Sequence, residues 1–271
     1  MNHAWLIITH GEFEILKLLV EGLDYANNDI YIHFDKKVKH IPKIKTINSR
    51  LFILKNRIDV RWGHVSQIKT ELLLFKEAAK NGPYSYYHLI SGVHLPLKPM
   101  QMIQDYFKSI NGYSALSDFE EPDSYEVNLK MRRYNCFLKN FASHNQFIKE
   151  SSQFLWKAAI ALQRVFRITR NDSRVYYKAR NWVSLTEEAV LFILSREKQI
   201  LHDYRFSFCG DEFFVPSLLM DSPLKNRIIA SDCLLLCQMI QANAKCFPLS
   251  ERQTLADSKF LFARKFTSKS E

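Results

Sequence analysis

The sequence predicts an α/β fold in which helices flank a mostly parallel central sheet. Short apolar segments alternate with segments of helical periodicity, and the chain opens strand, helix, strand at residues 5–9, 12–22 and 29–35. This alternation is typical of parallel sheets under helical cover. No linker-like segment interrupts the chain, so we expect one domain over residues 1–271.

The first half continues this alternation and the second half loosens it. Further strands are predicted at 51–54, 58–61 and Tyr86–Ser91, and helices at 65–79 and Met100–Ser109. Later segments are predicted as a charged loop at 118–134, a basic helix at 153–170, a strand at 182–185, and a helix that Thr186 caps and that runs to about Ser195.

The charge balance suggests anionic partners without choosing among them. The formal net charge is +10, which suits nucleic acid, acidic lipid or phosphorylated ligands. A nucleic-acid-binding protein gathers its cations on one face with aromatic residues among them. Here the cations are dispersed and no RNA- or DNA-binding motif occurs, so nucleic-acid binding is a distant alternative.

The cysteines and the N-terminus indicate a reducing compartment. The five cysteines form no CxxC pair, and their odd number argues against a disulfide framework or a zinc site. Residues 1–8 lack the layout of a signal peptide, and no apolar run reaches the length of a membrane-spanning helix. We therefore expect a cytoplasmic address.

Several familiar catalytic motifs are missing. The sequence contains no GxGxxG, GxxxxGK[ST], HExxH or GxSxG. It also contains no Asp-x-Asp, the usual sign of an α/β enzyme that uses a nucleotide-sugar with a bound metal. These absences argue against the common dinucleotide, P-loop, zinc-protease and hydrolase classes.

Seven short motifs nevertheless follow one another in order. They are Thr9-His10-Gly11, Tyr31-Ile-His-Phe-Asp35-Lys36-Lys37, Trp62-Gly-His-Val-Ser66, residues 86–99, Trp182-Val-Ser-Leu-Thr186, Gly210-Asp-Glu-Phe-Phe214 and Phe262-Ala-Arg-Lys-Phe266. Together they resemble the core-2/I-branching β-1,6-N-acetylglucosaminyltransferase family, which includes the peptide xylosyltransferases. The resemblance implies a GT-A-type, Rossmann-like nucleotide-sugar-binding fold, with a nucleotide-binding half at about 1–115 and an acceptor and catalytic half at about 116–271.

The resemblance also implies the chemistry. The family's members are inverting glycosyltransferases that need no metal and no cofactor beyond the UDP-sugar donor. We expect transfer of N-acetylglucosamine from UDP-GlcNAc to a hydroxyl of a glycan, with xylose or another UDP-sugar as the alternative. Because the chain lacks the anchor and stem of the animal Golgi enzymes, it looks like a bacterial, cytosol-facing relative that builds lipopolysaccharide, capsule or another surface glycan.

Glu212 is the expected catalytic base. Inverting transfer needs a carboxylate that takes the proton of the acceptor hydroxyl, and the family places its base at the glutamate of an Asp-Glu-Phe motif. Gly210 and Asp211 can start a helix, which would put Glu212 in a first turn where the dipole favours a charged carboxylate. The alternative is a glutamate that only caps backbone amides.

Lys265 is the expected partner of the leaving diphosphate. Without a metal, side-chain cations must offset the charge that develops on the phosphate oxygens. The resemblance matches Lys265 to the basic residue of the terminal motif, with Lys245 as a second cation and Arg252 as its alternative. A solvated tail lysine is the competing interpretation for Lys265.

The remaining site residues follow from the resemblance. Uridine and ribose binding fall to the ends of the first strands, with Trp62 near the base, and the full UDP set is Thr9, His10, Gly11, Asp35, Trp62, Lys245, Arg264 and Lys265. The acceptor set is Glu120, Arg132, Arg133, Ser91, Gly92 and Trp182. No metal ligand is expected.

Two departures from the family pattern lie near the expected acceptor side. His94 stands where the family has an aspartate, and Ala179-Arg180-Asn181 stands before Trp182 where the family has Gly-Ser.

A basic helix from Gln153 to Arg170 bears on location. It combines four cations with Phe154, Trp156 and Phe166, as helices that rest on anionic lipid do. A core-packed helix with a solvated basic face is the alternative. The hypothesis is peripheral contact with the inner face of the membrane, which suits a lipid-linked acceptor.

Overall fold

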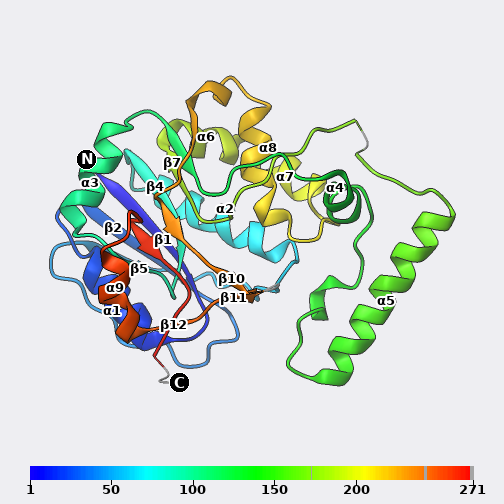
Figure 1. The fold of residues 1–271 in the computed structure, drawn as a ribbon, viewed down its shortest axis with the longest axis horizontal. Coiled ribbons are helices and arrows are strands. Elements are labelled where there is room, and N and C mark those ends of the chain that lie inside the picture. Colours follow the sequence, from blue (N-terminus) through cyan, green and yellow to red (C-terminus); the bar gives the residue numbers. More distant parts are fainter. Residues whose placement is uncertain (172, 241–242, 269–271) are drawn as a thin grey trace.

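The protein has a seven-stranded central sheet between two layers of helices (Figure 1). The computed structural model describes residues 1–171, 173–240 and 243–268. In spatial order the strands are β3 (Arg50–Ile53), β2 (Asn28–Phe34), β1 (His3–Thr9), β4 (Tyr86–Ser91), β7 (Val183–Thr186), β6 (Ser114–Leu116) and β8 (Ile228–Ala230). β7 pairs antiparallel with both β4 and β6, and the other pairs are parallel. The predicted α/β class with a mostly parallel sheet is confirmed.

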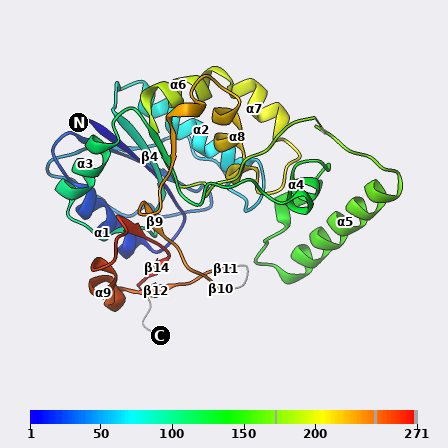
Figure 2. The same ribbon diagram turned by 45° about the horizontal axis from the view of Figure 1, so that its top comes forward.

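Helices alternate with strands in the first half of the chain, as predicted, and follow one another more often in the second half. They are α1 (Phe13–Leu23), α2 (Ser66–Ala79), α3 (Met100–Ser109), α4 (Ser124–Lys130), α5 (Gln146–Val165), α6 (Glu187–Ser195), α7 (Glu197–Asp203), α8 (Phe214–Met220) and α9 (Arg252–Ala256). In a turned view α5 still stands apart from the rest (Figure 2). No helix in the described part of the chain is long and apolar enough to span a membrane.

Short strands, most of them in the last part of the chain, form small additional sheets. β5 (Leu95–Pro96), β13 (Phe262–Ala263) and β9 (Leu235–Leu236) form one, with β13 in the middle. β10 (Met239–Ile240) pairs with β11 (Asn243–Ala244), and β12 (Phe247–Pro248) pairs in parallel with β14 (Phe266–Thr267).

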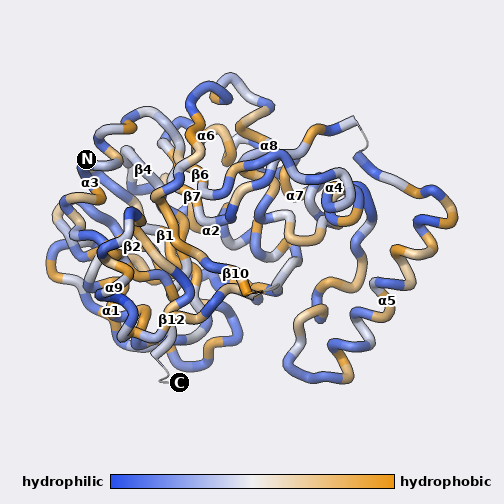
Figure 3. The backbone as a smooth tube through the Cα atoms, in the orientation of Figure 1, coloured by the Kyte–Doolittle hydropathy of each residue, from blue (hydrophilic) through white to orange (hydrophobic). Residues whose placement is uncertain are grey.

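Two hydrophobic cores cover the two faces of the sheet. Because side chains alternate along a strand, Leu6 of β1 enters one core while Trp5 and Ile7 enter the other. The first core packs under α2, α6 and α8, and the second under α1, α3 and the C-terminal strands. The apolar colour of the tube is accordingly concentrated on the central strands (Figure 3).

Most element boundaries agree with the prediction, and four do not. Residues 58–61 form a loop instead of a strand, because the amides of Ile58 and Val60 donate to His33 and Asp35 side chains. The charged loop at 118–134 contains α4. Its cap is Asp123, whose carboxylate accepts from the Glu126 amide at 2.8 Å.

The other two errors concern a helix start and a turn. The basic helix begins seven residues earlier than predicted, where Asn145 caps it by accepting from the Ile148 amide at 3.1 Å. The predicted helix at Gly210 is a single 3₁₀ turn, Gly210–Glu212, and α8 starts only at Phe214.

Gly92 allows β1 and β4 to meet where they end. Its amide donates to the Ile8 carbonyl at 2.9 Å, and a Cβ at this position would lie 2.7 Å from Thr9 Cβ and closer still to Thr9 Oγ1. Gly92→Ala should therefore lower the free energy of unfolding by about 1–3 kcal/mol, the usual range for overpacking.

Gly11→Ala is the matched control in a urea titration of both variants. Gly11 also follows a strand end, but no atom lies within 4 Å of the Cβ that it would gain. Equal stability of the two variants would contradict the assigned contact between Gly92 and Thr9.

Candidate active site

The predicted nucleotide residues gather at the carboxyl edge of the parallel strands. Thr9 of β1 pairs with Phe34 of β2, and Ile8 pairs with Ser91 of β4, so the three strands end side by side. In open α/β sheets this edge is the usual place for a ligand. The loops that begin at His10, Asp35 and Gly92 therefore start from one edge.

The first loop contributes an open surface and a neutral imidazole. Thr9 is buried, and its hydroxyl donates weakly to the Gly11 carbonyl at 3.4 Å. Space beside Gly11 is open. Desolvation lowers the pKa of His10, Asp35 opposes that shift, and Lys265 lowers the pKa further, which places the imidazole within electrostatic reach of both charges.

Asp35 is buried and already paired. Its Oδ1 accepts from the Lys37 amide at 2.8 Å, and its Oδ2 accepts from Lys37 Nζ at 2.7 Å and from the Val60 amide at 3.2 Å. Lys37 Nζ also bonds Asp59. A ribose that bound Asp35 would share the carboxylate with these donors.

Lys265 is fixed in the fold and is not a free tail lysine. Its carbonyl accepts from the Phe247 amide at 2.8 Å, and its amide donates to the Lys245 carbonyl at 3.3 Å. The Phe266 amide donates to Val93, in the loop after β4, at 2.9 Å. Further along, Ser268 donates to Glu12 in the loop after β1.

The structure places the two candidate second cations differently. Lys245 lies beside Lys265 along the backbone, and its Nζ is 3.4 Å from Glu251 and 4.9 Å from the centre of the Phe247 ring. Arg252 donates to the Pro96 carbonyl at 3.3 Å. It lines a separate hollow of about 560 Å³ with Gly22, Pro96, Leu97, Lys98, Pro99, Met100, Leu249, Ser250, Gln253 and Ala256. This arrangement favours Lys245.

The Trp182 ring contacts two side chains, Arg264 of the C-terminal segment and His94 of the loop after β4. The guanidinium of Arg264 lies 4.9 Å from the Trp182 ring centre, and the His94 ring meets Trp182 edge-on at 5.1 Å. Burial, followed by Arg264, lowers the pKa of His94 well below its ordinary value, so this imidazole is neutral. His94 Nδ1 accepts from the Ser91 amide at 3.1 Å and lies 2.7 Å from Ser91 Oγ.

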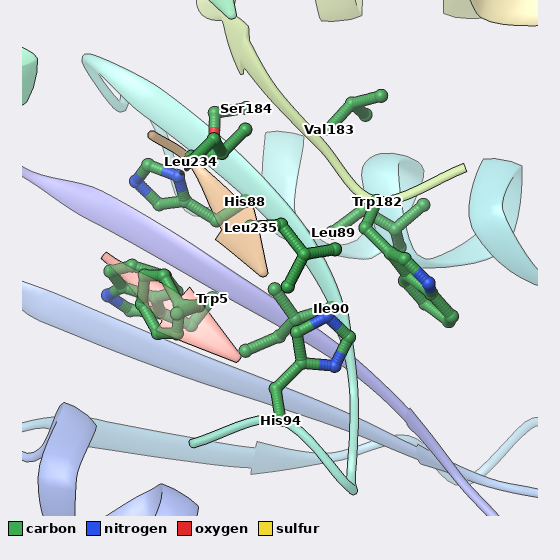
Figure 4. A pocket seen from close by; sticks show the side chains of 11 residues that line it. Trp5, His88, Leu89, Ile90, His94, Trp182, Val183, Ser184, Leu234 and Leu235 are labelled. Atoms are coloured by element: carbon green, nitrogen blue, oxygen red, sulfur yellow. Dashed lines mark hydrogen bonds between the residues drawn. The ribbon is translucent and has the colours of Figure 1, made fainter. Parts of the chain in front are cut away.

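A small cavity adjoins these side chains. It measures about 10 Å³, which is room for about one water molecule and far too little for a sugar. Figure 4 shows the rings of His94 and Trp182 on one side and those of Trp5 and His88 on the other. The ring nitrogens His94 Nε2 and Trp182 Nε1 have no partner among the described residues. The donor sugar therefore belongs elsewhere.

Glu212 lies at the end of the 3₁₀ turn with about a third of its side chain exposed. Its Oε2 is 3.7 Å from Lys130 Nζ, and its carbonyl accepts from the Ala179 amide at 3.0 Å. Ala179 is three residues before Trp182. Residues 179–182 therefore connect the Glu212 turn to the Trp182 ring, on which Arg264 packs. The glutamate is accessible to a substrate hydroxyl and its backbone is fixed.

Lys130 connects Glu212 to a chain of ion pairs. Lys130 Nζ lies 2.6 Å from Glu126, which also pairs with Lys178 at 2.9 Å, and Lys178 lies 3.7 Å from Glu120. Burial disfavours the charge of Lys130, but Glu212, Cys209 and Glu126 outweigh burial and raise its pKa. Lys130 is therefore a permanent cation beside the predicted base.

Two buried carboxyls lie behind Glu212. Gln67 Nε2 donates to Asp211 Oδ2 at 2.8 Å, while Asp211 Oδ1 has no partner among the described residues. Burial, with the charge of Glu212 second, raises the pKa of Asp211 to about 7. Burial and Asp211 also raise the pKa of Glu71 well above its ordinary value, an effect that Asn181 offsets in part. Glu71 therefore stays protonated at neutral pH, while Asp211 exchanges its proton close to neutral pH.

Trp62 lies on an aromatic platform next to this turn. Its ring centre lies 6.0 Å from that of Phe141 in a stacked arrangement and 5.4 Å from that of Phe208 edge-on, and 54% of the residue is exposed. The Cys209 amide donates to the Gly63 carbonyl at 3.0 Å, which joins the Trp62 loop to the Glu212 turn. An exposed indole in this position offers a face on which a base can stack.

The predicted acceptor residues do not all gather. Glu120 exchanges two backbone hydrogen bonds of 2.9 Å with Lys178, close to the ion-pair chain. Arg133 instead donates to the Ile168 carbonyl, and Arg132 donates to Asn128 at 3.4 Å. Among the described residues, the cation that pairs with Glu212 is Lys130, which the acceptor set omits although it lies on α4 near both arginines.

Other neighbours of the predicted site are also absent from the sequence-based set. They are Lys37, Gln67, Glu71, Asp211, Glu126 and Lys178. The i,i+4 spacing of Glu126 and Lys130 is typical of an ion pair on one face of a helix, so the sequence could have predicted α4. Within the described residues, no cluster of three or more histidine, cysteine or acidic side chains is arranged to hold a metal.

The sequence matches the family Core-2/I-Branching enzyme over residues 3–255. The chain belongs to this family. It is therefore a glycosyltransferase, and the family implies a nucleotide-sugar donor and a glycan or peptide acceptor. The predicted family is confirmed. No curated protein matches the sequence.

Solved structures give weaker likenesses. Mouse xyloside xylosyltransferase 1 in its apo form is 9% identical, with 97% of this chain and 96% of that chain covered and a TM-score of 0.41. TarS 1–349 of S. aureus is 8% identical, with 84% and 57% covered and a TM-score of 0.40. The 4-diphosphocytidyl-2C-methyl-D-erythritol synthase of Anaerococcus prevotii is 10% identical, with 85% and 90% covered and a TM-score of 0.35. All three TM-scores lie below 0.5.

The proton on Asp211 makes stability depend on pH. The folded protein keeps a proton that the unfolded chain releases above the ordinary aspartate pKa of 3.8, so the wild type loses stability as the pH rises from there to about 7. Asp211→Asn mimics the neutral acid. Relative to wild type, its free energy of unfolding should rise by up to about 1.4 kcal/mol for each pH unit in this window.

Urea unfolding of both proteins at several pH values between about 5 and about 8 measures this difference. Histidines with lowered pKa, such as His88 and His94, titrate in the opposite direction, but they are common to both proteins and cancel. A difference that stayed constant across the window would show that Asp211 is charged in the folded protein.

Proposed function

We propose that the protein is an inverting, metal-independent glycosyltransferase that moves N-acetylglucosamine from UDP-GlcNAc to a hydroxyl of a glycan acceptor. The observation that carries this proposal is the position of Glu212, a partly exposed carboxylate beside Lys130 on a turn that adjoins Trp62. Family membership supplies the reaction class. The acceptor that we favour is a precursor of a surface polysaccharide or lipopolysaccharide, including lipid-linked forms.

In the proposed reaction Glu212 takes the proton of the acceptor hydroxyl while that oxygen attacks the anomeric carbon of the donor. The bond between the anomeric carbon and the phosphate oxygen breaks on the opposite face, and its electron pair leaves with UDP. The configuration at the anomeric carbon therefore inverts. Burial raises the pKa of Glu71 and of Asp211, which reduces the negative charge that these two carboxyls place around Glu212.

The leaving diphosphate needs positive charge, and the C-terminal segment offers it. Lys265 and Lys245 lie side by side along the backbone, next to the loop that follows β4. The charge of Lys265 lowers the pKa of His10, so the first loop lies within electrostatic range of Lys265. These side chains can offset phosphate charge in the way that a bound cation does in other transferases.

Xylose or another UDP-sugar on the same scaffold is the alternative, because donor choice depends on the space around the sugar. A thermal-shift and hydrolysis screen over UDP-sugars separates these options. Family membership gives the nucleic-acid alternative no support.

Glu212→Gln should reduce transfer by roughly 10²–10⁴-fold, which is what loss of a general base removes. Binding of UDP, measured by calorimetry, should persist because the amide has nearly the same shape. Glu188→Gln is the control, since Glu188 pairs with Arg227 in an exposed ion pair outside the site. Full activity in Glu212→Gln would refute the assignment of the base.

Chelation tests the absence of a metal. Treatment with EDTA should leave the transfer rate unchanged, because the proposed charge on the diphosphate is offset by Lys265 and Lys245. The assay compares initial rates before treatment, after treatment and after addition of Mn²⁺. A strict requirement for Mn²⁺ would contradict this part of the proposal.

A further inference from the structure

Helix α5 carries apolar side chains that the fold does not use. It is a helix of 20 residues that stands apart from the sheet and its covering helices in both ribbon views (Figures 1 and 2). Only Ser152, Ile160 and Gln163 are buried along its length. The helix therefore attaches to the body along one side.

The attaching side is polar and aromatic. Trp156 Nε1 donates to Asn135 Oδ1 at 2.8 Å, and its ring meets Phe141 and Phe208. Gln163 bonds both the amide and the carbonyl of Tyr134. The expectation that Trp156 faces a membrane is wrong, because its ring packs inward on the platform that also supports Trp62.

The opposite side is apolar and exposed. Its exposed fractions reach 79% for Phe147, 70% for Phe154 and 75% for Val165. The same side includes Ile148, Leu155, Leu162 and the capping residue Phe166. With 3.6 residues per turn these positions fall in one stripe about 120° wide, which we call the α5 stripe.

A stripe of this kind is unusual on a free surface. Apolar helix faces in soluble proteins normally pack on a core, and a contiguous exposed patch marks an interaction site. The tube in Figure 3 accordingly shows apolar segments along α5 where no other element covers it.

The charges around the stripe identify its partner. From residue 146 to 170 the chain has five cations, Lys149, Lys157, Arg164, Arg167 and Arg170, and one carboxylate, Glu150. Lys157, Arg164 and Arg167 are exposed. The segment thus has a net charge of +4 on a protein of net charge +10. Apolar residues flanked by cations are the pattern of helices that lie in the headgroup region of anionic lipid.

We propose that α5 docks on an anionic membrane surface, with the α5 stripe inserted among the lipid headgroups and the flanking cations at the phosphates. The inward face of α5 shares its aromatic cluster with Trp62, so docking holds the candidate active site next to the lipid. This inference rests on the surface of α5 alone and stands apart from the proposed donor and mechanism.

Sedimentation with vesicles tests the proposal without any activity assay. The wild-type protein should bind vesicles that contain phosphatidylglycerol, bind pure phosphatidylcholine vesicles at least about tenfold more weakly, and lose affinity as salt rises. The double variant Phe154→Glu/Leu162→Glu should lose about tenfold or more of its affinity for the anionic vesicles. Both side chains are exposed, so its thermal unfolding should match wild type.

Two controls make the result specific. Ile47→Glu places the same charge at an apolar residue that is 93% exposed and outside α5, and it should leave binding unchanged. Lys157→Glu/Arg164→Glu leaves the stripe intact and should weaken binding to anionic vesicles only. It also keeps the test available if the double glutamate variant is unstable.

Other outcomes overturn the proposal. They are no binding to either vesicle, or binding that the stripe variant does not weaken. A second copy of the chain would be the occupant if the wild type formed a dimer that Phe154→Glu/Leu162→Glu dissociated while neither protein bound vesicles. Sedimentation velocity on the same samples detects that dimer.

Discussion

The insertion of the C-terminal segment at the carboxyl edge of the sheet is the constraint on which the site depends. Three parallel strands end together, and the segment around Lys265 is hydrogen-bonded to Phe247, Lys245 and Val93 beside them. Ser268 ties the same segment to Glu12. Residues more than two hundred positions apart in the sequence therefore meet, and the backbone of a lysine is fixed where the strands end.

The carboxyl groups around the predicted catalytic base differ in burial and therefore in pKa. Glu71, Asp211 and Glu212 lie near enough to influence one another's pKa, and a neighbouring negative charge disfavours ionisation of a carboxyl group. Burial raises the pKa of both buried members, while Glu212 is partly exposed and faces Lys130. Of these three carboxyl groups, Glu212 is the one that a substrate can reach.

The sequence predicted the fold well where the spacing of apolar residues matched a strand or a helix throughout the element. The opening strand, helix and strand and the Thr186 cap are examples. The prediction failed where side chains took over backbone partners, as at Ile58 and Val60, or where a cap was read as loop, as at Asp123. The site residues at the strand ends were predictable from topology. Lys130 was not, because its role comes from where α4 packs.

The aromatic cluster of Trp62, Phe141, Trp156 and Phe208 joins the site to α5. A sequence alone cannot tell that Trp156 turns inward while Phe154 turns outward, since both suit either face. Burial decides it, and with it the direction in which the helix can meet a partner.

A crystal structure with bound UDP-GlcNAc tests the central claim most directly. We expect the diphosphate beside Lys265 and Lys245 and the uracil ring near Trp62 and Asp35. The anomeric carbon should face Glu212. A nucleotide bound in the separate hollow beside Arg252, or a sugar turned away from Glu212, would contradict it.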